Sequence, residues 1–237
     1  MSEGPRAVLL DIEGTTTPVD FVYRVLFPYA HERLETWLQA HAREPEVVSD
    51  VQGLRDEHAR DLKAGRTPPA WGDSHAAVAA YARWLMDQDR KATALKSLQG
   101  KIWADGYASG ALRGQVYEDV PRALRRWAEA GRKVAIFSSG SVPAQKLIFG
   151  HSDHGDLTGS LAAYFDTTTG PKAEAESYRR IAAALGEEPR DVLFVSDAFA
   201  ELEAAREAGM QTAQAVRSDT LPGARSHRLV TTFDRLP

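Results

Sequence analysis

Polar side chains that could carry out chemistry follow three predicted strands, and one lysine precedes a predicted helix. The set consists of Asp11, Glu13, Ser138, Ser139, Lys172, Ser196 and Asp197. In an open parallel sheet, ligands bind outside the carboxyl ends of the strands, so we expect these groups to converge on one crevice. Two acids suit a hard cation, hydroxyls and a helix start suit an anion, and the lysine supplies a fixed positive charge. This combination predicts a phosphoryl-transfer site.

Each kind of side chain in this set has a chemical role in phosphoryl transfer. A phosphate ester dianion repels a carboxylate nucleophile, so Mg²⁺ must neutralise both, and Asp197 is the natural second ligand opposite Asp11. Hydroxyls and backbone N–H groups of SSGS (138–141) can hold the transferring oxygens, while Lys172 offsets charge that the metal does not reach. Glu13 is left as the general acid and base.

The same residues also have purely structural interpretations. An isolated acid is often a loop residue or a helix cap, an isolated serine favours turns, and an isolated lysine is mostly solvated. Asp197 could cap the helix that follows it, and that role is compatible with metal binding. Their joint occurrence at strand ends favours the functional interpretation. Glu201, four residues after Asp197, could face the same site as a further acid, but we favour its interpretation as part of a solvated helix face.

Four short aliphatic or β-branched runs are the strands expected to position these groups. They are AVLLD (7–11), KVAIFSS (133–139), DVLFVSD (191–197) and QTAQAV (211–216). Each is a candidate buried parallel strand. Helical patterns separate the later runs, at 121–131, 175–186 and 200–209. The alternation predicts an α/β fold with a doubly wound parallel sheet.

Residues 20–112 have a different pattern, with helix-length apolar periodicity and no convincing strand. Phe27, Ala30, Leu34 and Leu38 recur at helical spacing. The stretch AGRTPPAWGD (64–73) interrupts two of the helices. We therefore predict a helical cap at 20–112, inserted into an α/β core formed by 1–19 and 113–237.

Composition and charge narrow the classes of partner. Of 237 residues, 43% are hydrophobic and 26% are charged, which is ordinary for a globular protein, and no apolar window reaches the length of a membrane span. The absence of cysteine excludes disulfides, thiolate zinc sites and cysteine nucleophiles. A net charge of -4 gives no basic field for nucleic acid. We expect a cytoplasmic protein with a small-molecule partner, no nucleic-acid or membrane partner, and a monomeric state by default.

As a set, the motifs resemble those of the haloacid dehalogenase superfamily of phosphatases. DIEGT resembles the first motif, SSGS the second, Lys172 the third and SDAFAE the acidic fourth. Longer blocks, among them DIEGTTTPVDFVYRVLFPYA and QKLIFGHSDHGDLTGSLAAYFDTTTGPK, look like the enolase-phosphatase (acireductone synthase) family of methionine salvage. The likeness spans nearly the whole chain. Two features depart from the superfamily: Glu13 stands where Asp is usual, and residues 198–200 are small or apolar where polar ones are frequent.

The resemblance implies a substrate, a metal and a role for each residue. Members of the family enolise 2,3-diketo-5-methylthiopentyl 1-phosphate and then remove its phosphate to give an acireductone, with one Mg²⁺. It implies that Asp11 is the nucleophile, forms a phosphoaspartyl intermediate and also binds the metal. It further implies that Glu13 protonates the leaving enol oxygen, activates water and offers its main-chain carbonyl to the metal. The remaining implied roles are substrate binding by Ser138, Ser139 and Lys172, and completion of the magnesium site by Asp197.

The enolising base and two other functions stay open. No motif fixes the base, and Glu13 is one candidate, because Mg²⁺ polarising the diketone would lower the barrier to proton abstraction. The chain could instead be a phosphatase for another small phosphate ester without the enolase step. It could also be a catalytically silent phospholigand-binding protein on the same fold. In the enzymatic interpretation, the cap would close over the substrate and exclude water.

Overall fold

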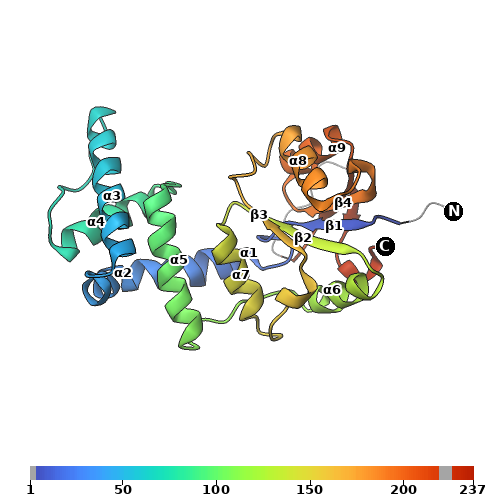
Figure 1. Ribbon diagram of the computed structural model, residues 1–237, viewed down its shortest axis with the longest axis horizontal. Coiled ribbons are helices and arrows are strands. Elements are labelled where there is room, and N and C mark those ends of the chain that lie inside the picture. The colour runs from blue at the N-terminus through green and yellow to red at the C-terminus, as the bar shows by residue number, and fades with distance from the viewer. Residues whose placement is uncertain (1–3, 219–225) are drawn as a thin grey trace. The chain divides into compact units, whose positions relative to one another are not determined.

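The computed structural model describes residues 4–218 and 226–237 (Figure 1). The chain divides into two compact units, one formed by Met1–Val22 with Arg113–Pro237 and the other by Tyr23–Leu112. The first unit carries all the candidate site residues. None of the helices in the described part of the chain is long and apolar enough to cross a membrane.

A parallel six-stranded sheet forms the centre of the first unit. Its strands are β1 (Ala7–Leu10), β2 (Lys133–Phe137), β3 (Ala163–Phe165), β4 (Val192–Ser196), β5 (Gln211–Ala215) and β6 (Arg228–Val230). Their order is β3-β2-β1-β4-β5-β6, and every pairing is parallel. The four predicted strands and the α/β fold class are confirmed, and β3 and β6 are additional edge-side strands.

The position of β1 decides where a ligand can bind. It pairs with β2 on one side and with β4 on the other, so that Leu10 lies opposite both Ile136 and Val195. The strand order therefore reverses between β1 and β4, and open α/β sheets bind ligands outside the carboxyl ends of the strands at such a switch point. The sheet brings the ends of β1, β2 and β4 together there.

Helices cover both faces of this sheet. The helices of the first unit are α1 (Val19–Phe21), α6 (Asp119–Glu129), α7 (Val142–Gly150), α8 (Ala175–Leu185) and α9 (Phe199–Glu207), with short 3-10 turns η2 (Thr158–Ser160), η3 (Pro189–Asp191) and η4 (Phe233–Arg235). Helices α8 and α9 lie on one face, and α6 lies on the opposite face (Figure 1). The three predicted helices of this part are confirmed, and α7 was not predicted.

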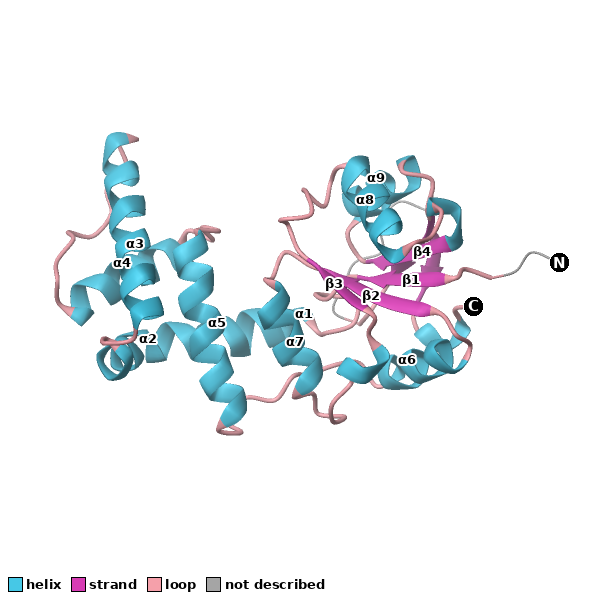
Figure 2. Cartoon of the chain, viewed as in Figure 1, coloured by secondary structure: helices cyan, strands magenta, loops and turns pink. Residues whose placement is uncertain are grey.

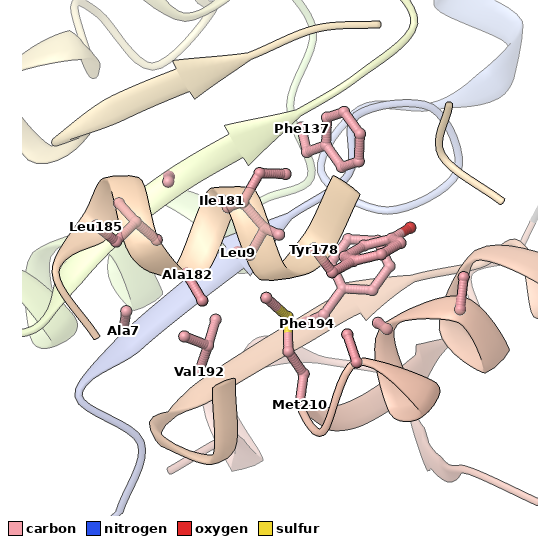
Figure 3. Close-up of a cluster of buried hydrophobic side chains, with 14 of the residues drawn as sticks. Ala7, Leu9, Phe137, Tyr178, Ile181, Ala182, Leu185, Val192, Phe194 and Met210 are labelled. Atoms are coloured by element: carbon pink, nitrogen blue, oxygen red, sulfur yellow. The ribbon is translucent and has the colours of Figure 1, made fainter. Parts of the chain in front are cut away.

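The core beneath α8 is built from strand residues that alternate towards it. Leu9, Phe137 and Phe194 lie in one buried cluster with Tyr178 and Ile181 of α8 (Figure 3). The Tyr178 ring lies 5.6 Å from that of Phe137 and 5.0 Å from that of Phe194. Each large side chain buried in this way contributes about 2 kcal/mol of hydrophobic stabilisation. The cluster fixes α8, and with it the segment that carries Lys172.

The second unit is entirely helical over residues 23–112, all of which are described (Figure 2). The π-helical segment η1 (Val22–Leu26) leads into α2 (Phe27–His41), α3 (Pro45–Lys63), α4 (His75–Asp87) and α5 (Thr93–Ala108). Ala30, Leu34 and Leu38 are buried in its core, as their spacing predicts. The segment 64–73 separates α3 from α4. The role of this unit as a cap stays a prediction.

Candidate active site

Asp11 follows β1 directly, and three donors hold its carboxylate. Only 3% of the residue is exposed. Its Oδ1 accepts hydrogen bonds from the Ile12 amide at 2.8 Å and from Lys172 Nζ at 2.6 Å. Its Oδ2 accepts one from Ser196 Oγ at 3.0 Å. Because the donors come from separate segments of the chain, the carboxylate has a fixed orientation at the end of the sheet.

The segment after Asp11 is a tight turn whose composition explains the string GTTT. Gly14 has a φ of 68°, a left-handed conformation that glycine adopts without steric cost. The amides of residues 15–17 all donate to the Ile12 carbonyl, at distances of 2.9 to 3.1 Å. Thr16 Oγ1 donates to the Asp11 carbonyl at 2.9 Å. We call residues 12–17 the nucleophile turn, because the turn follows Asp11, the predicted nucleophile, and contains Glu13.

Asp197 follows β4 and is tied to the nucleophile turn. Its amide donates to Thr15 Oγ1 at 3.0 Å. Burial of Asp197 and the negative charge of Asp11 raise the pKa of the Asp197 carboxyl to about 6. Glu13, which is half-buried, adds a smaller contribution in the same direction. The two aspartates thus form a mutually repelling pair that a bound cation would stabilise.

Lys172 lies just before α8 and bridges two carboxylates. Its Nζ is 2.6 Å from Asp11 Oδ1 and 2.7 Å from Glu201 Oε2. Burial alone would lower the pKa of Lys172, but the two carboxylates outweigh that effect and raise the pKa above its ordinary value. The Tyr178 hydroxyl donates to the Lys172 carbonyl at 2.7 Å, which anchors the main chain of the lysine. The ammonium group is therefore a permanent positive charge at the site.

Glu201 belongs to this cluster, so its interpretation as part of a solvated helix face was wrong. Its side chain is 18% exposed and pairs with Lys172, and its Oε2 lies 3.2 Å from Ser196 Oγ, whose one proton is available to either Glu201 or Asp11. Burial and the charge of Asp11 raise the pKa of Glu201 to about 7. The signal in the sequence was its spacing of four residues from Asp197, which places the side chain over the first turn of α9.

The SSGS segment joins β2 to the start of α7. The Ser138 side chain is buried, and its Oγ accepts a hydrogen bond from the Gly140 amide at 3.1 Å. Ser139 is exposed. Gln145 of α7 donates from Nε2 to the carbonyls of Gly140 and Phe165, both at 2.8 Å, and so links this loop to the end of β3. A loop that leads into a helix N-terminus suits an anion, and Gln145 is a supporting residue that no sequence motif indicated.

The structure brings one group of predicted residues together and leaves another nearby. Asp11, Lys172 and Ser196 are joined by direct contacts, and Asp197 is tied to the turn that carries Asp11. Ser138 and Ser139 stand at the end of the neighbouring strand β2. The arrangement provides a fixed carboxylate, a permanent cation and a serine-containing loop that leads into the N-terminus of α7. Their catalytic roles stay predictions.

The donor set fits a hard divalent cation that takes few protein ligands. Within residues 4–218 and 226–237, no group of three or more His, Asp or Glu side chains is arranged to hold a metal ion. Asp11 and Asp197 would supply two carboxylates, and the resemblance adds the main-chain carbonyl of Glu13. Mg²⁺ accepts one or two carboxylates and completes its shell with water and substrate phosphate. The residues present therefore fit Mg²⁺.

The sheet and this site define a hydrolase of known type. A family model described as haloacid dehalogenase-like hydrolase matches residues 5–209. The chain is 56% identical to an enolase-phosphatase E1 of Synechococcus elongatus over 89% of its own length and 88% of the relative's. It is 53% identical to an enolase-phosphatase E1 of Sorangium cellulosum, over 97% and 96% of the two chains. The chain therefore belongs to the haloacid dehalogenase-like hydrolases and, within them, to the enolase-phosphatases.

A solved structure shows the same fold. The UTR4 protein of Saccharomyces cerevisiae is 34% identical and superposes with a TM-score of 0.82, over 98% of this chain and 100% of the yeast chain. The agreement over such a length supports the arrangement of strand ends on which the site depends.

Proposed function

We propose that the chain is a Mg²⁺-dependent enolase-phosphatase acting on 2,3-diketo-5-methylthiopentyl 1-phosphate, with an acireductone as its product. The observation that carries the proposal is the Asp11 carboxylate, buried at the switch point of the sheet and held by Lys172 and Ser196. The enolase-phosphatase relatives, matched over most of both chains, support the choice of substrate.

In the proposed phosphoryl transfer, Asp11 and Glu13 have separate roles. Asp11 attacks phosphorus, the bond from phosphorus to the enol oxygen breaks, and Glu13 donates a proton to that oxygen. Glu13 then accepts a proton from the water that attacks the phosphoaspartyl group, which releases phosphate and restores Asp11. Mg²⁺, held by Asp11, Asp197 and the Glu13 carbonyl, would neutralise charge between the phosphate and the nucleophile.

The remaining residues bind the phosphate. Lys172 supplies a positive charge beside Asp11, and the exposed Ser139 together with Ser138 stands at the loop that would receive the phosphate oxygens. Enolisation, which comes first, moves a proton from carbon to a carbonyl oxygen. Glu13 is one candidate for the base, because it is the acid of the site that already exchanges protons in the later steps.

An assay of the purified protein tests this function. With the diketo phosphate and Mg²⁺ we expect an enol absorbance change together with phosphate release, and the absence of both would refute the proposal. A panel of simple sugar phosphates distinguishes the alternatives. Comparable turnover of those esters would favour a general phosphatase, whereas binding of the diketo phosphate without any turnover would favour a silent phospholigand-binding protein.

We also propose the setting in which the enzyme works. A small-molecule phosphate ester is its partner, rather than nucleic acid or a membrane, and the sequence pI of about 6.0 supports this. The lack of cysteine fits a reducing compartment, and we propose the cytoplasm. A monomer is the proposed state, to be checked by light scattering.

A further inference from the structure

Arg217 is a buried arginine that lies outside all the phosphatase motifs. It follows β5, and only 7% of the residue is exposed. Its Nε and Nη2 both donate to the main-chain carbonyl of Thr15, at 3.0 and 2.9 Å. Thr15 is in the middle of the nucleophile turn. The guanidinium group thus binds the turn from the segment that follows β5, a strand that is not adjacent to β1.

The guanidinium group is itself rigidly held. It lies 4.4 Å from the ring centroid of Tyr117 and 4.4 Å from that of Phe233. Its Nη1 donates to Asp119 Oδ2 at 2.8 Å. A planar, permanently charged fork held by aromatic stacking and a buried carboxylate loses little further freedom when it binds a carbonyl. A lysine ammonium group could not reproduce this geometry.

The segment that Arg217 binds is connected to Asp197 and to Asp11. Thr15 Oγ1 accepts the hydrogen bond from the Asp197 amide. On the next residue, Thr16 Oγ1 donates to the Asp11 carbonyl. The Thr16 carbonyl accepts a hydrogen bond from the Tyr117 amide at 3.0 Å, so the turn is held from the same side at two successive residues.

We propose that Arg217 is a positioning residue for phosphoryl transfer, which keeps the nucleophile turn in the geometry that aligns Asp11 and Glu13 with Asp197. The proposal rests on the proposed function of the site. Arg217 does not touch the reacting atoms and acts through Thr15. Since small displacements of reacting groups cost large factors in rate, the loss of this contact should appear in kcat more than in KM.

Arg126 provides a matched control for the test. It donates to the carbonyls of Phe233 and Leu236, at 2.8 and 3.1 Å, and its guanidinium lies 5.6 Å from the Trp127 ring. Arg217 contacts the same C-terminal segment, through the Phe233 ring and the Thr231 carbonyl. Arg126 therefore anchors that segment with guanidinium–carbonyl hydrogen bonds, and these bonds lie outside the nucleophile turn. Arg126→Ala measures the effect of losing a structural arginine alone.

The experiment compares Arg217→Ala, Arg217→Lys and Arg126→Ala with the unaltered protein, in kcat, KM and melting temperature. For Arg217→Ala we expect kcat to fall roughly 10- to 100-fold, with KM changed less than about threefold. For Arg217→Lys, which keeps the charge, we expect a smaller loss of kcat. Arg126→Ala should lower the melting temperature and leave kcat within about twofold of the unaltered value.

Several other outcomes would overturn the proposal. A folded Arg217→Ala variant with unaltered kcat would do so, as would an equal loss of kcat in Arg126→Ala. If Arg217→Ala does not fold, a folded Arg217→Lys with reduced kcat supports the proposal and one with unaltered kcat refutes it. If neither variant folds, Arg217 is only structural. Should the unaltered protein not turn over the diketo phosphate, the proposed function fails, and the same comparison is made with p-nitrophenyl phosphate.

Discussion

At the scale of the residue, one lysine balances two carboxylates. Lys172 Nζ is about equally distant from Asp11 and Glu201, at 2.6 and 2.7 Å. Removing the charge of Glu201 would leave the ammonium group paired with Asp11 alone. The stronger attraction would hold the Asp11 carboxylate back from phosphorus and withdraw the lysine from the substrate phosphate.

We therefore predict that Glu201→Gln lowers kcat roughly tenfold or more, by misplacing both groups. Steady-state phosphate release measures the effect. Glu207→Gln is the matched control, because Glu207 is an exposed residue at the end of the same helix, α9. Similar rates in both variants, or no loss in Glu201→Gln, would show that Glu201 is dispensable.

Glu13 is the second residue with a testable role, because its part in enolisation can be measured separately from its part in phosphate release. It stands where related phosphatases usually have Asp, and its longer side chain would extend its reach towards the carbon that loses a proton. We predict that Glu13→Asp retains most phosphate release from a preformed enol phosphate and slows enolisation about tenfold or more. The two rates are measured separately, by absorbance and by phosphate release. Equal losses of both would deny Glu13 a separate role in enolisation.

At the scale of the element, some helices and strands could be predicted because their burial leaves a recognisable pattern in the local sequence. Strands β1, β2 and β4 are buried on both faces, which makes each of them a continuous apolar run. In contrast, β3 and β6 have three residues each, and no periodicity can be recognised over so short a length. Helix α7, with the sequence VPAQKLIFG, likewise has too few turns to show an apolar stripe.

The residues of the candidate site likewise divide into those that could be located from sequence and those that could not. Asp11, Lys172 and Asp197 could be located from sequence because each adjoins the end of a strand or the start of a helix. Arg217 could not, and the spacing of Glu201 from Asp197 did not reveal its pairing with Lys172. Their contacts depend on partners from distant segments: Lys172 for Glu201 and the Thr15 carbonyl for Arg217. Such contacts leave no local pattern and become visible only when the sheet is assembled.

Helix α3 of the helical unit contains a buried carboxylate whose pairing should matter for stability. The side chain of Asp61 is completely inaccessible and accepts hydrogen bonds from Arg66 Nη1 at 2.6 Å, Tyr81 Oη at 2.8 Å and Arg90 Nη1 at 3.0 Å. Burial alone would raise the pKa of Asp61, but these three donors outweigh it and lower the pKa below 3.8. The ionised form is thus the stable one in the folded protein.

We predict that Asp61→Ala destabilises the protein by about 3 kcal/mol, because it leaves charged donors without their partner. Denaturant unfolding measures the loss. Asp56→Ala, at an exposed position of the same helix, should change stability by less than about 0.5 kcal/mol. Equal effects in the two variants would contradict the account of Asp61.

The sign of the pH dependence follows from the lowered pKa. The stabilisation from Asp61 is fully present above the ordinary carboxyl pKa of 3.8 and is lost as the pH falls through the lower, folded value. We expect the difference in stability between the unaltered protein and Asp61→Ala to shrink below about pH 4. Unfolding curves at neutral and acidic pH test this, and a difference that stays constant or grows in acid would contradict it.

At the scale of the whole molecule, the metal should be needed for chemistry and not for folding. The Asp11 carboxylate is already held by Lys172, Ser196 and the Ile12 amide, so the site does not require a cation to be formed. We predict that a chelator abolishes phosphate release, that added Mg²⁺ restores it, and that the melting temperature falls only by the small amount expected from lost ligand binding. Full turnover in chelator, or unfolding caused by it, would contradict this prediction.

The central claim is that Asp11, at the end of β1, is the group that takes the phosphoryl group from the substrate. The most direct measurement is peptide mass spectrometry of the protein quenched in acid during turnover of the diketo phosphate. We expect a phosphoryl group on the peptide that contains Asp11, and neither this modification nor phosphate release in Asp11→Asn. Modification of a different residue, or undiminished turnover in Asp11→Asn, would contradict the claim.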